Sequence, residues 1–118
     1  MVASEAMQEV LERFAERFNA SSDLARMTRG WDRTLRISAQ DAGWVHGLRV
    51  DGGRAAWVTA PEPSRAEIAL QGNADTLAAI FRGELSPTEP YLDGSLLVRS
   101  SEEDMMKLDV FTLMVWGE

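Results

Sequence analysis

The stretch of sequence that decides the fold is residues 44–59, WVHGLRVDGGRAAWVT. On both sides of Asp51-Gly52-Gly53, large apolar side chains recur at every second position, the period of a strand with one buried face. The Asp-Gly-Gly sequence favours a tight turn, because glycine tolerates a positive φ. The stretch therefore predicts a β-hairpin with strands over residues 44–50 and 54–59.

Further strands are predicted on both sides of this hairpin. Residues 31–38 alternate in the same way and predict a strand ahead of it. After the hairpin, Pro61-Glu62-Pro63 interrupts the pattern, because proline lacks the amide hydrogen that a sheet uses. Alternation resumes over residues 65–70, and a fifth strand is predicted over residues 95–99. The first four strands follow one another with short links.

Helical spacing occurs in three longer segments. Residues 5–18 carry an apolar stripe with acidic and basic residues opposite it, and Ser4 can cap this helix. Residues 73–82 show a similar stripe. Residues 102–115 follow Ser101, which has an acidic residue three positions later, a capping signal.

The order α, β, β, β, β, α, β, α predicts an α+β fold, in which a five-stranded, mainly antiparallel sheet has helices packed on one face. We expect residues 1–118 to form a single domain, since a chain of this length builds one core. The helix between the fourth and fifth strands makes a crossover, which allows those two strands to lie parallel or at opposite edges. Residues 86–90 are expected to form a loop or a single turn.

Composition excludes several classes of function. The 118 residues include 12 Lys and Arg against 19 Asp and Glu, a net charge of −7, with one histidine and no cysteine. No disulfide, thiolate zinc site or cysteine nucleophile is therefore possible. An acidic chain also lacks the positive footprint of nucleic-acid binders and polybasic membrane binders. The longest apolar tract, Val110–Trp116, has seven residues, against the roughly 20 of a membrane span. We expect a cytoplasmic protein with no nucleic-acid partner and no stable membrane insertion.

The residues give little support for catalysis. A serine nucleophile needs a base, and the single histidine, His46, lies within an alternating strand, where packing or hydrogen bonding is its usual role. Glu102-Glu103-Asp104 stands at a predicted helix N-terminus, where acidic residues complement the helix dipole. We therefore expect no catalytic residue, no metal site and no cofactor. A carboxylate site assembled only by folding is the remaining route to an enzyme.

The predicted last helix is apolar around most of its circumference. Between Met105 and Trp116, the polar residues are Lys107, Asp109 and Thr112. Such a helix must be covered on more than one side. One side can pack on the sheet, and the other needs a neighbouring helix, a partner subunit or an apolar ligand. Methionine suits surfaces that accept varied apolar shapes.

Residues 80–98, IFRGELSPTEPYLDGSLLV, follow a helix with Gly-x-Leu-x-Pro, then an aromatic residue, a glycine and a strand of the type Leu-x-Val. The matching positions are Gly83, Leu85, Pro87, Tyr91, Gly94, Leu96 and Val98. In order and spacing they resemble the sterol carrier protein 2 family, and the likeness extends from about Trp31 to the C-terminus. The resemblance implies a five-stranded, largely antiparallel sheet with helices over one face. It also implies an enclosed apolar cavity that holds fatty acyl chains, sterols or other lipids.

These observations predict non-enzymatic binding, extending to transfer, of an apolar lipid such as a fatty acyl chain or a sterol-like molecule. The expected ligand lies between the sheet and the helices, against the apolar side chains of Leu48, Trp57, Ile68, Leu77, Phe81, Leu96, Met105, Leu108 and Phe111. Each buried CH2 of such a ligand contributes ~0.8 kcal/mol before ordering costs. The alternative is an accessory or interaction domain with a collapsed core, which forms a homodimer or docks on a partner enzyme through its apolar C-terminal helix.

Overall fold

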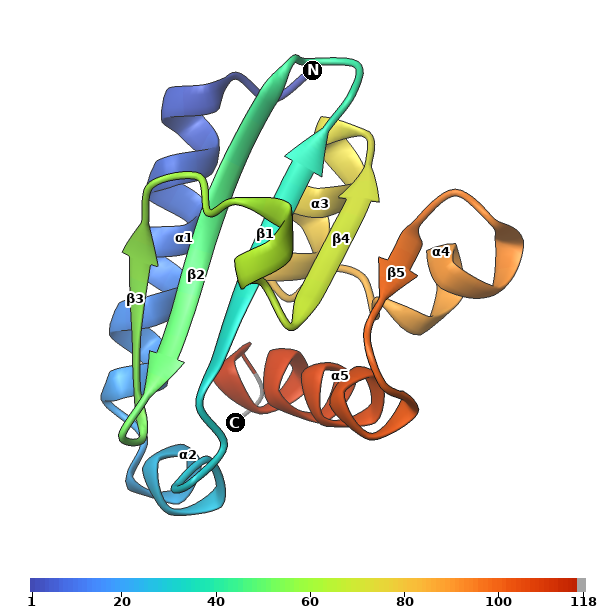
Figure 1. Cartoon of the computed structure of the whole chain (residues 1–118). Coiled ribbons are helices and arrows are strands. Elements are labelled where there is room, and N and C mark those ends of the chain that lie inside the picture. The colour runs from blue at the N-terminus through green and yellow to red at the C-terminus, as the bar shows by residue number, and fades with distance from the viewer. Residues whose placement is uncertain (117–118) are drawn as a thin grey trace.

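The sheet forms from the five predicted strands, with small shifts at their ends (Figure 1). In the computed structural model, which describes residues 1–116, the strands are β1 (Arg33–Ala39), β2 (Trp44–Asp51), β3 (Arg54–Val58), β4 (Ile68–Gly72) and β5 (Leu97–Arg99). Their order across the sheet is β3-β2-β1-β4-β5. The pairs β1/β2, β2/β3 and β4/β5 are antiparallel, and β1/β4 is parallel. The α+β class and the mainly antiparallel sheet are therefore confirmed, with one parallel pair that makes the sheet mixed.

The connection between β3 and β4 produces the parallel pair, and it is not the short link that the sequence predicts. Residues 59–67 cross the sheet from β3 at one edge to the far side of β1, and include the 3-10 helix η1 (Pro63–Arg65). Figure 1 shows this segment in front of the sheet, on the face opposite α1 and α3. Because Pro63 and Arg65 belong to η1, β4 begins at Ile68 and not at residue 65. A crossing of the sheet face returns the chain in the same direction, which gives the parallel β1/β4 register.

β4 and β5 are antiparallel neighbours, so neither of the two arrangements considered for them from the sequence, parallel or at opposite edges, is present. The connection contains α3 (Ala74–Phe81) and a second helix, α4 (Thr88–Asp93), where the sequence predicts a loop or a single turn. One helix alone would return the chain parallel to β4. The second helix turns the chain once more, so that β5 enters the sheet in the opposite direction beside β4.

The first helix, α1 (Ser4–Asn19), buries the stripe predicted from its spacing: Met7, Val10, Leu11, Phe14, Ala15 and Phe18. It packs on β3 and β2 and contacts α3, which packs on β1. Both helices lie behind the sheet in Figure 1. The short helix α2 (Ser22–Met27) follows, and α5 (Glu102–Trp116) contacts both α1 and α2. The helices α1 and α3 thus cover one face of the sheet.

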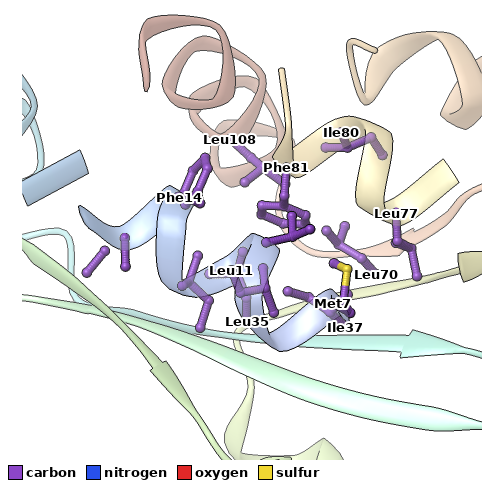
Figure 2. Packing of buried hydrophobic residues seen from close by; sticks show 14 of the residues in the cluster. Met7, Leu11, Phe14, Leu35, Ile37, Leu70, Leu77, Ile80, Phe81 and Leu108 are labelled. Carbon is purple, nitrogen blue, oxygen red and sulfur yellow. The ribbon is translucent and has the colours of Figure 1, made fainter. Parts of the chain in front are cut away.

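One hydrophobic cluster joins the covered face of the sheet to α1, α3 and α5. Figure 2 shows Met7, Leu11 and Phe14 of α1 between Leu35 and Ile37 of the sheet and the side chains of α3. Phe14 meets Phe81 of α3 edge-on, with ring centroids 5.2 Å apart.

Candidate functional site

Seven of the nine predicted ligand-binding residues lie together in this cluster. Each is at most 4% exposed: Leu48, Ile68, Leu77, Phe81, Leu96, Leu108 and Phe111. Trp57 is half-buried and packs against the cluster. Met105 is half-buried on α5 and is not among the residues that form the cluster or pack against it. The structure therefore brings most of the predicted set into one apolar region.

The prediction omitted the residues of α1 that share this region. Met7, Leu11 and Phe14 are at most 2% exposed and occupy the layer between the sheet and α3 (Figure 2). The apolar stripe of α1 was a sufficient signal for them, because a helix so patterned must bury that stripe against the sheet. A ligand in this layer would have to share it with side chains of α1.

A buried carboxylate ties the start of α5 to the start of β1. Asp104 is 5% exposed, and its two oxygens accept hydrogen bonds from Trp31 Nε1 at 2.8 Å and Arg33 Nε at 3.0 Å. Burial acts to raise the pKa of Asp104, but the hydrogen bonds from Arg33 and Trp31 and the charge of Arg33 outweigh it and lower that pKa. The predicted cap is also present, since Ser101 Oγ accepts from Asp104 N at 3.0 Å. Asp104 therefore does more than stabilise the start of α5, because it also anchors this helix to Trp31 and Arg33.

The middle and the C-terminal end of α5 are held by the loop with the Gly-x-Leu-x-Pro motif and by the last residue of α3. Trp116 Nε1 donates to the carbonyl oxygen of Phe81 at 2.7 Å, and Ser86 Oγ donates to Asp109 Oδ1 at 2.6 Å. Gly83 has a φ of 78°, and a Cβ at this position would collide with the side chain of Trp116. The glycine of the motif is therefore required both by its backbone conformation and by its contact with α5.

The outer side of α5 remains apolar and exposed. Met106, Val110 and Leu113, at helical spacing, are 70%, 43% and 60% exposed. Beside them, a groove of about 480 Å³, here called the α2–α5 groove, is lined by Met27, Glu102, Glu103, Met106, Lys107, Val110 and Phe111. Phe111 also meets Trp31 edge-on, with ring centroids 5.2 Å apart. It thereby connects the groove to the buried cluster.

Comparison with known proteins gives a match in structure and none in sequence. No protein-family model matches the chain, and no curated protein sequence matches it. The ubiquinone synthesis protein UbiJ-SCP2 superimposes with a TM-score of 0.66 at 15% identity, over 94% of this chain and 93% of that one. Apo sterol carrier protein 2 from Yarrowia lipolytica superimposes with a TM-score of 0.63 at 12% identity, over 98% and 93%. The chain has the sterol carrier protein 2 fold. The predicted resemblance is confirmed.

The sterol carrier protein 2 fold of this chain also matches part of a larger protein. Two structures of the sec-alkylsulfatase Pisa1, described from Pseudomonas, superimpose with TM-scores of 0.68 and 0.66 at 15% and 17% identity. The matches cover 91% and 83% of this chain but only 16% and 15% of the sulfatase chains. At these identities the likeness concerns the fold.

Folding places a serine beside the single histidine, a contact that the sequence does not reveal. His46 Nε2 lies 3.0 Å from both the hydroxyl and the carbonyl oxygen of Ser4, and Trp57 Nε1 lies 3.0 Å from His46 Nδ1. The indole N–H only donates, so Nδ1 accepts and the ring proton is on Nε2. A serine nucleophile needs an unprotonated Nε2. The contact therefore fastens the first turn of α1 to the sheet and does not activate Ser4.

Ser4 also differs from its expected role as a helix cap. The N-cap of α1 is Ala3, with no side-chain hydrogen bond, and Ser4 is the first helical residue. Its hydroxyl faces the imidazole of His46 instead.

Within residues 1–116, no three histidine or acidic side chains are placed to hold a metal ion. None of the helices in that part of the chain is both long enough and apolar enough to cross a membrane.

The buried carboxylate predicts a stability effect. Replacing Asp104 by asparagine (Asp104→Asn) removes the charge that faces Arg33 and is expected to lower the free energy of unfolding by about 1.5–3 kcal/mol. The matched control is Glu103→Gln, because Glu103 lies in the same helical turn but its side chain is 76% exposed, and it pairs only with Lys107 in residues 1–116. We expect a change within about 0.5 kcal/mol for the control. Urea unfolding followed by tryptophan fluorescence measures both, and equal losses would contradict the anchoring role.

The histidine contact predicts a dependence of stability on pH. Burial lowers the pKa of His46 below its ordinary value of 6.5, although the hydrogen bond to the Ser4 backbone opposes this shift. The unfolded chain therefore takes up this proton near pH 6.5 and the folded protein only at lower pH. The contribution of His46 to stability is constant above about pH 6.5 and falls as the pH drops below it.

Urea unfolding between pH 5 and 8, with wild type and His46→Gln, isolates this contribution from that of the carboxylates. We expect a steeper loss of stability below pH 6.5 in the wild type than in the variant. Nitrogen NMR of the imidazole should show the proton on Nε2. A histidine that titrates above 6.5, or that carries its proton on Nδ1, contradicts the assignment.

Proposed function

We propose that the chain binds an apolar small molecule without chemical conversion, and that residues 1–118 act as one binding domain. The ligand is of the class predicted from the sequence, a fatty acyl chain or a sterol-like lipid. The observation that carries the proposal is the α2–α5 groove, where exposed Met27, Met106 and Val110 lead to Phe111 and through it to the buried cluster. The names of the sterol carrier proteins that share this fold support the proposal.

In the proposed complex, an apolar chain lies along α5 and passes Phe111 toward Trp31 and Leu108. All three residues belong to the hydrophobic cluster. In the complex, their contacts with one another are therefore replaced by apolar contacts with the ligand. Ten buried CH2 groups would contribute roughly 8 kcal/mol before the cost of ordering the ligand. Among the other predicted residues, Leu48 and Ile68 on the sheet and Leu77 and Phe81 on α3 belong to the same cluster, whereas Met105 lies on α5 outside it.

Charges at the rim of the groove favour one kind of lipid. The charged residues that line the groove are Glu102, Glu103 and Lys107, and Lys107 Nζ lies 3.3 Å from Glu103 Oε1. A carboxylate headgroup would have to compete with Glu103 for this ammonium group. We therefore propose that an uncharged lipid, such as a sterol-like alcohol, binds more tightly than an ionised fatty acid. We further propose a cytoplasmic location, with no nucleic-acid partner and no stable membrane insertion.

Native mass spectrometry of gently purified protein, followed by organic extraction, tests the proposal. We expect an apolar adduct, or saturable binding of an added sterol or fatty acid measured by tryptophan fluorescence. Val110→Glu places a charge in the groove and should weaken binding by about tenfold or more. Leu113→Glu is the matched control, because Leu113 is on the same helix and more exposed but does not line the groove. A protein without an adduct that also ignores both added lipids would disprove the proposal.

A second candidate function is the interaction domain, and the exposed stripe of Met106, Val110 and Leu113 favours it. In this alternative the stripe is covered by a second copy of the chain or by a partner enzyme. Light scattering should then give twice the monomer mass at micromolar concentration, and Leu113→Glu or Met106→Glu should restore the monomer. A wild-type protein that stays monomeric at all concentrations excludes the homodimer. Because Leu113→Glu leaves the groove intact, it separates dimerisation from lipid binding.

A further inference from the structure

The uncovered face of the sheet carries a second hollow, which the proposed lipid site does not use. Its volume is about 250 Å³, and it is lined by Arg36, Ser38, Pro63, Ala69, Leu70, Gln71, Leu97, Val98 and Arg99. Two of these residues are arginine and none is acidic. In a chain with a net charge of −7, such a lining marks a local site for a negatively charged group.

Strand register brings the two arginines together. Arg36 of β1 pairs with Ala69 of β4, and Ala69 pairs with Arg99 of β5, so the three side chains form one row on the same face. The outer positions of this row are about 10 Å apart, two strand spacings. The methyl group of Ala69 between them leaves room above the strand. The next row holds Ser38, Gln71 and Leu97, which add a hydroxyl and an amide beside the arginines.

The segment that crosses the sheet orients both guanidinium groups. Arg36 Nε donates to the carbonyl oxygen of Pro61, and Arg99 Nη2 donates to that of Pro63, each at 3.2 Å. Proline limits the movement of this segment, and the segment also rests on Gly47. A Cβ at Gly47 would lie 2.8 Å from Pro61 Cδ. The guanidinium groups are therefore positioned before any ligand arrives.

Most of the donors of these two guanidinium groups remain available to a ligand. Each group uses one N–H on the loop, and neither forms an ion pair with a carboxylate of residues 1–116. Glu67 immediately precedes β4, two positions before Ala69, and its Oε1 accepts a hydrogen bond from Thr34 N at 2.7 Å. Its carboxylate is thereby held toward the backbone of β1.

We infer that this hollow, the Arg36–Arg99 site, binds the dianionic group of a phosphate monoester. Two guanidinium groups that line one hollow offer several N–H donors, which suits a tetrahedral oxyanion with three free oxygens better than a carboxylate with two. A neighbouring hollow of about 330 Å³ shares Gln71 and Leu97 with the site and is also lined by Gln40, Asp41, Asn73 and Ser95. It provides room for a polar organic part of the ester, such as glycerol or a sugar.

Titration with inorganic phosphate, observed by NMR at the arginine Nε–H signals, tests the site directly. We expect saturable shifts at Arg36 and Arg99 and at the amides of Ala69 and Gln71. Arg49 is the internal control, because it lies on the same face of the sheet but already has partners. Its Nη1 donates to Thr34 Oγ1 at 2.9 Å, and its Nη2 lies 3.7 Å from Asp51 Oδ2. Shifts that grow without saturation and equally at all three arginines would show general charge screening and overturn the inference.

Variants give the second test. Arg36→Gln should weaken phosphate binding by about tenfold or more, the loss of one charged hydrogen-bonding partner, whereas Arg49→Gln should change it less than about twofold. Ala69→Glu places a carboxylate between the two guanidinium groups and should abolish binding even if Arg36→Gln fails to fold. Equal effects of Arg36→Gln and Arg49→Gln would also overturn the inference.

The same titration with glycerol phosphate and with vesicles identifies the source of the group. Binding of soluble glycerol phosphate supports a small phosphate ester as the ligand. Binding confined to phosphatidic acid vesicles, with none to phosphatidylcholine vesicles, supports a lipid headgroup. If phosphate, glycerol phosphate and phosphatidic acid vesicles all fail to bind, the site is not an oxyanion site. The lipid-binding proposal stands apart from this result, because the α2–α5 groove shares no residue with the hollow.

Discussion

Burial of one face of α1 against the sheet is the constraint on which the rest of the structure depends. Met7, Leu11 and Phe14 fill the layer between the sheet and α3, and Phe14 sets the position of α3 through its edge-on contact with Phe81. The carbonyl oxygen of Phe81 accepts the indole N–H of Trp116, so the same contact chain also fixes the end of α5. A loss of packing at α1 would therefore loosen both helices that border the proposed lipid path.

Because α1 and α3 occupy one face of the sheet, the two faces have different chemistry. The exposed side of α1 carries four glutamates against two arginines, Arg13 and Arg17, whereas the uncovered face of the sheet presents Arg36, Arg49 and Arg99. The net charge of −7 thus hides an uneven distribution. Composition argues well against large polyanions such as nucleic acids, but it does not exclude one small anion at a basic hollow.

Local patterns in the sequence predict the helices, the strands and their buried faces. They do not predict contacts between residues that are far apart in the chain. The buried face of α1 follows from spacing alone, because the 3.6-residue period acts within the helix. The parallel β1/β4 pair depends on where residues 59–67 cross the sheet, which no local pattern records. Asp104 shows the same limit, because a carboxylate at a helix start has a complete local explanation, while its partner Trp31 lies 73 positions away. Ser4 and His46, 42 positions apart, meet in the same way.

The segment with the Gly-x-Leu-x-Pro motif, on which the resemblance was based, holds α5 in place in this fold. Gly83 makes room for Trp116, and Ser86 within the motif loop donates to Asp109. These contacts serve packing, so in this chain the motif bears on the fold, which is what the solved structures share with it at 12–17% identity. On the outer side of α5, Met106 and Val110 line the α2–α5 groove, and Leu113 lines a separate hollow beside Gly83 and Leu85 of the motif. The motif therefore bears on the placement of α5 and leaves the composition of the α2–α5 groove unspecified.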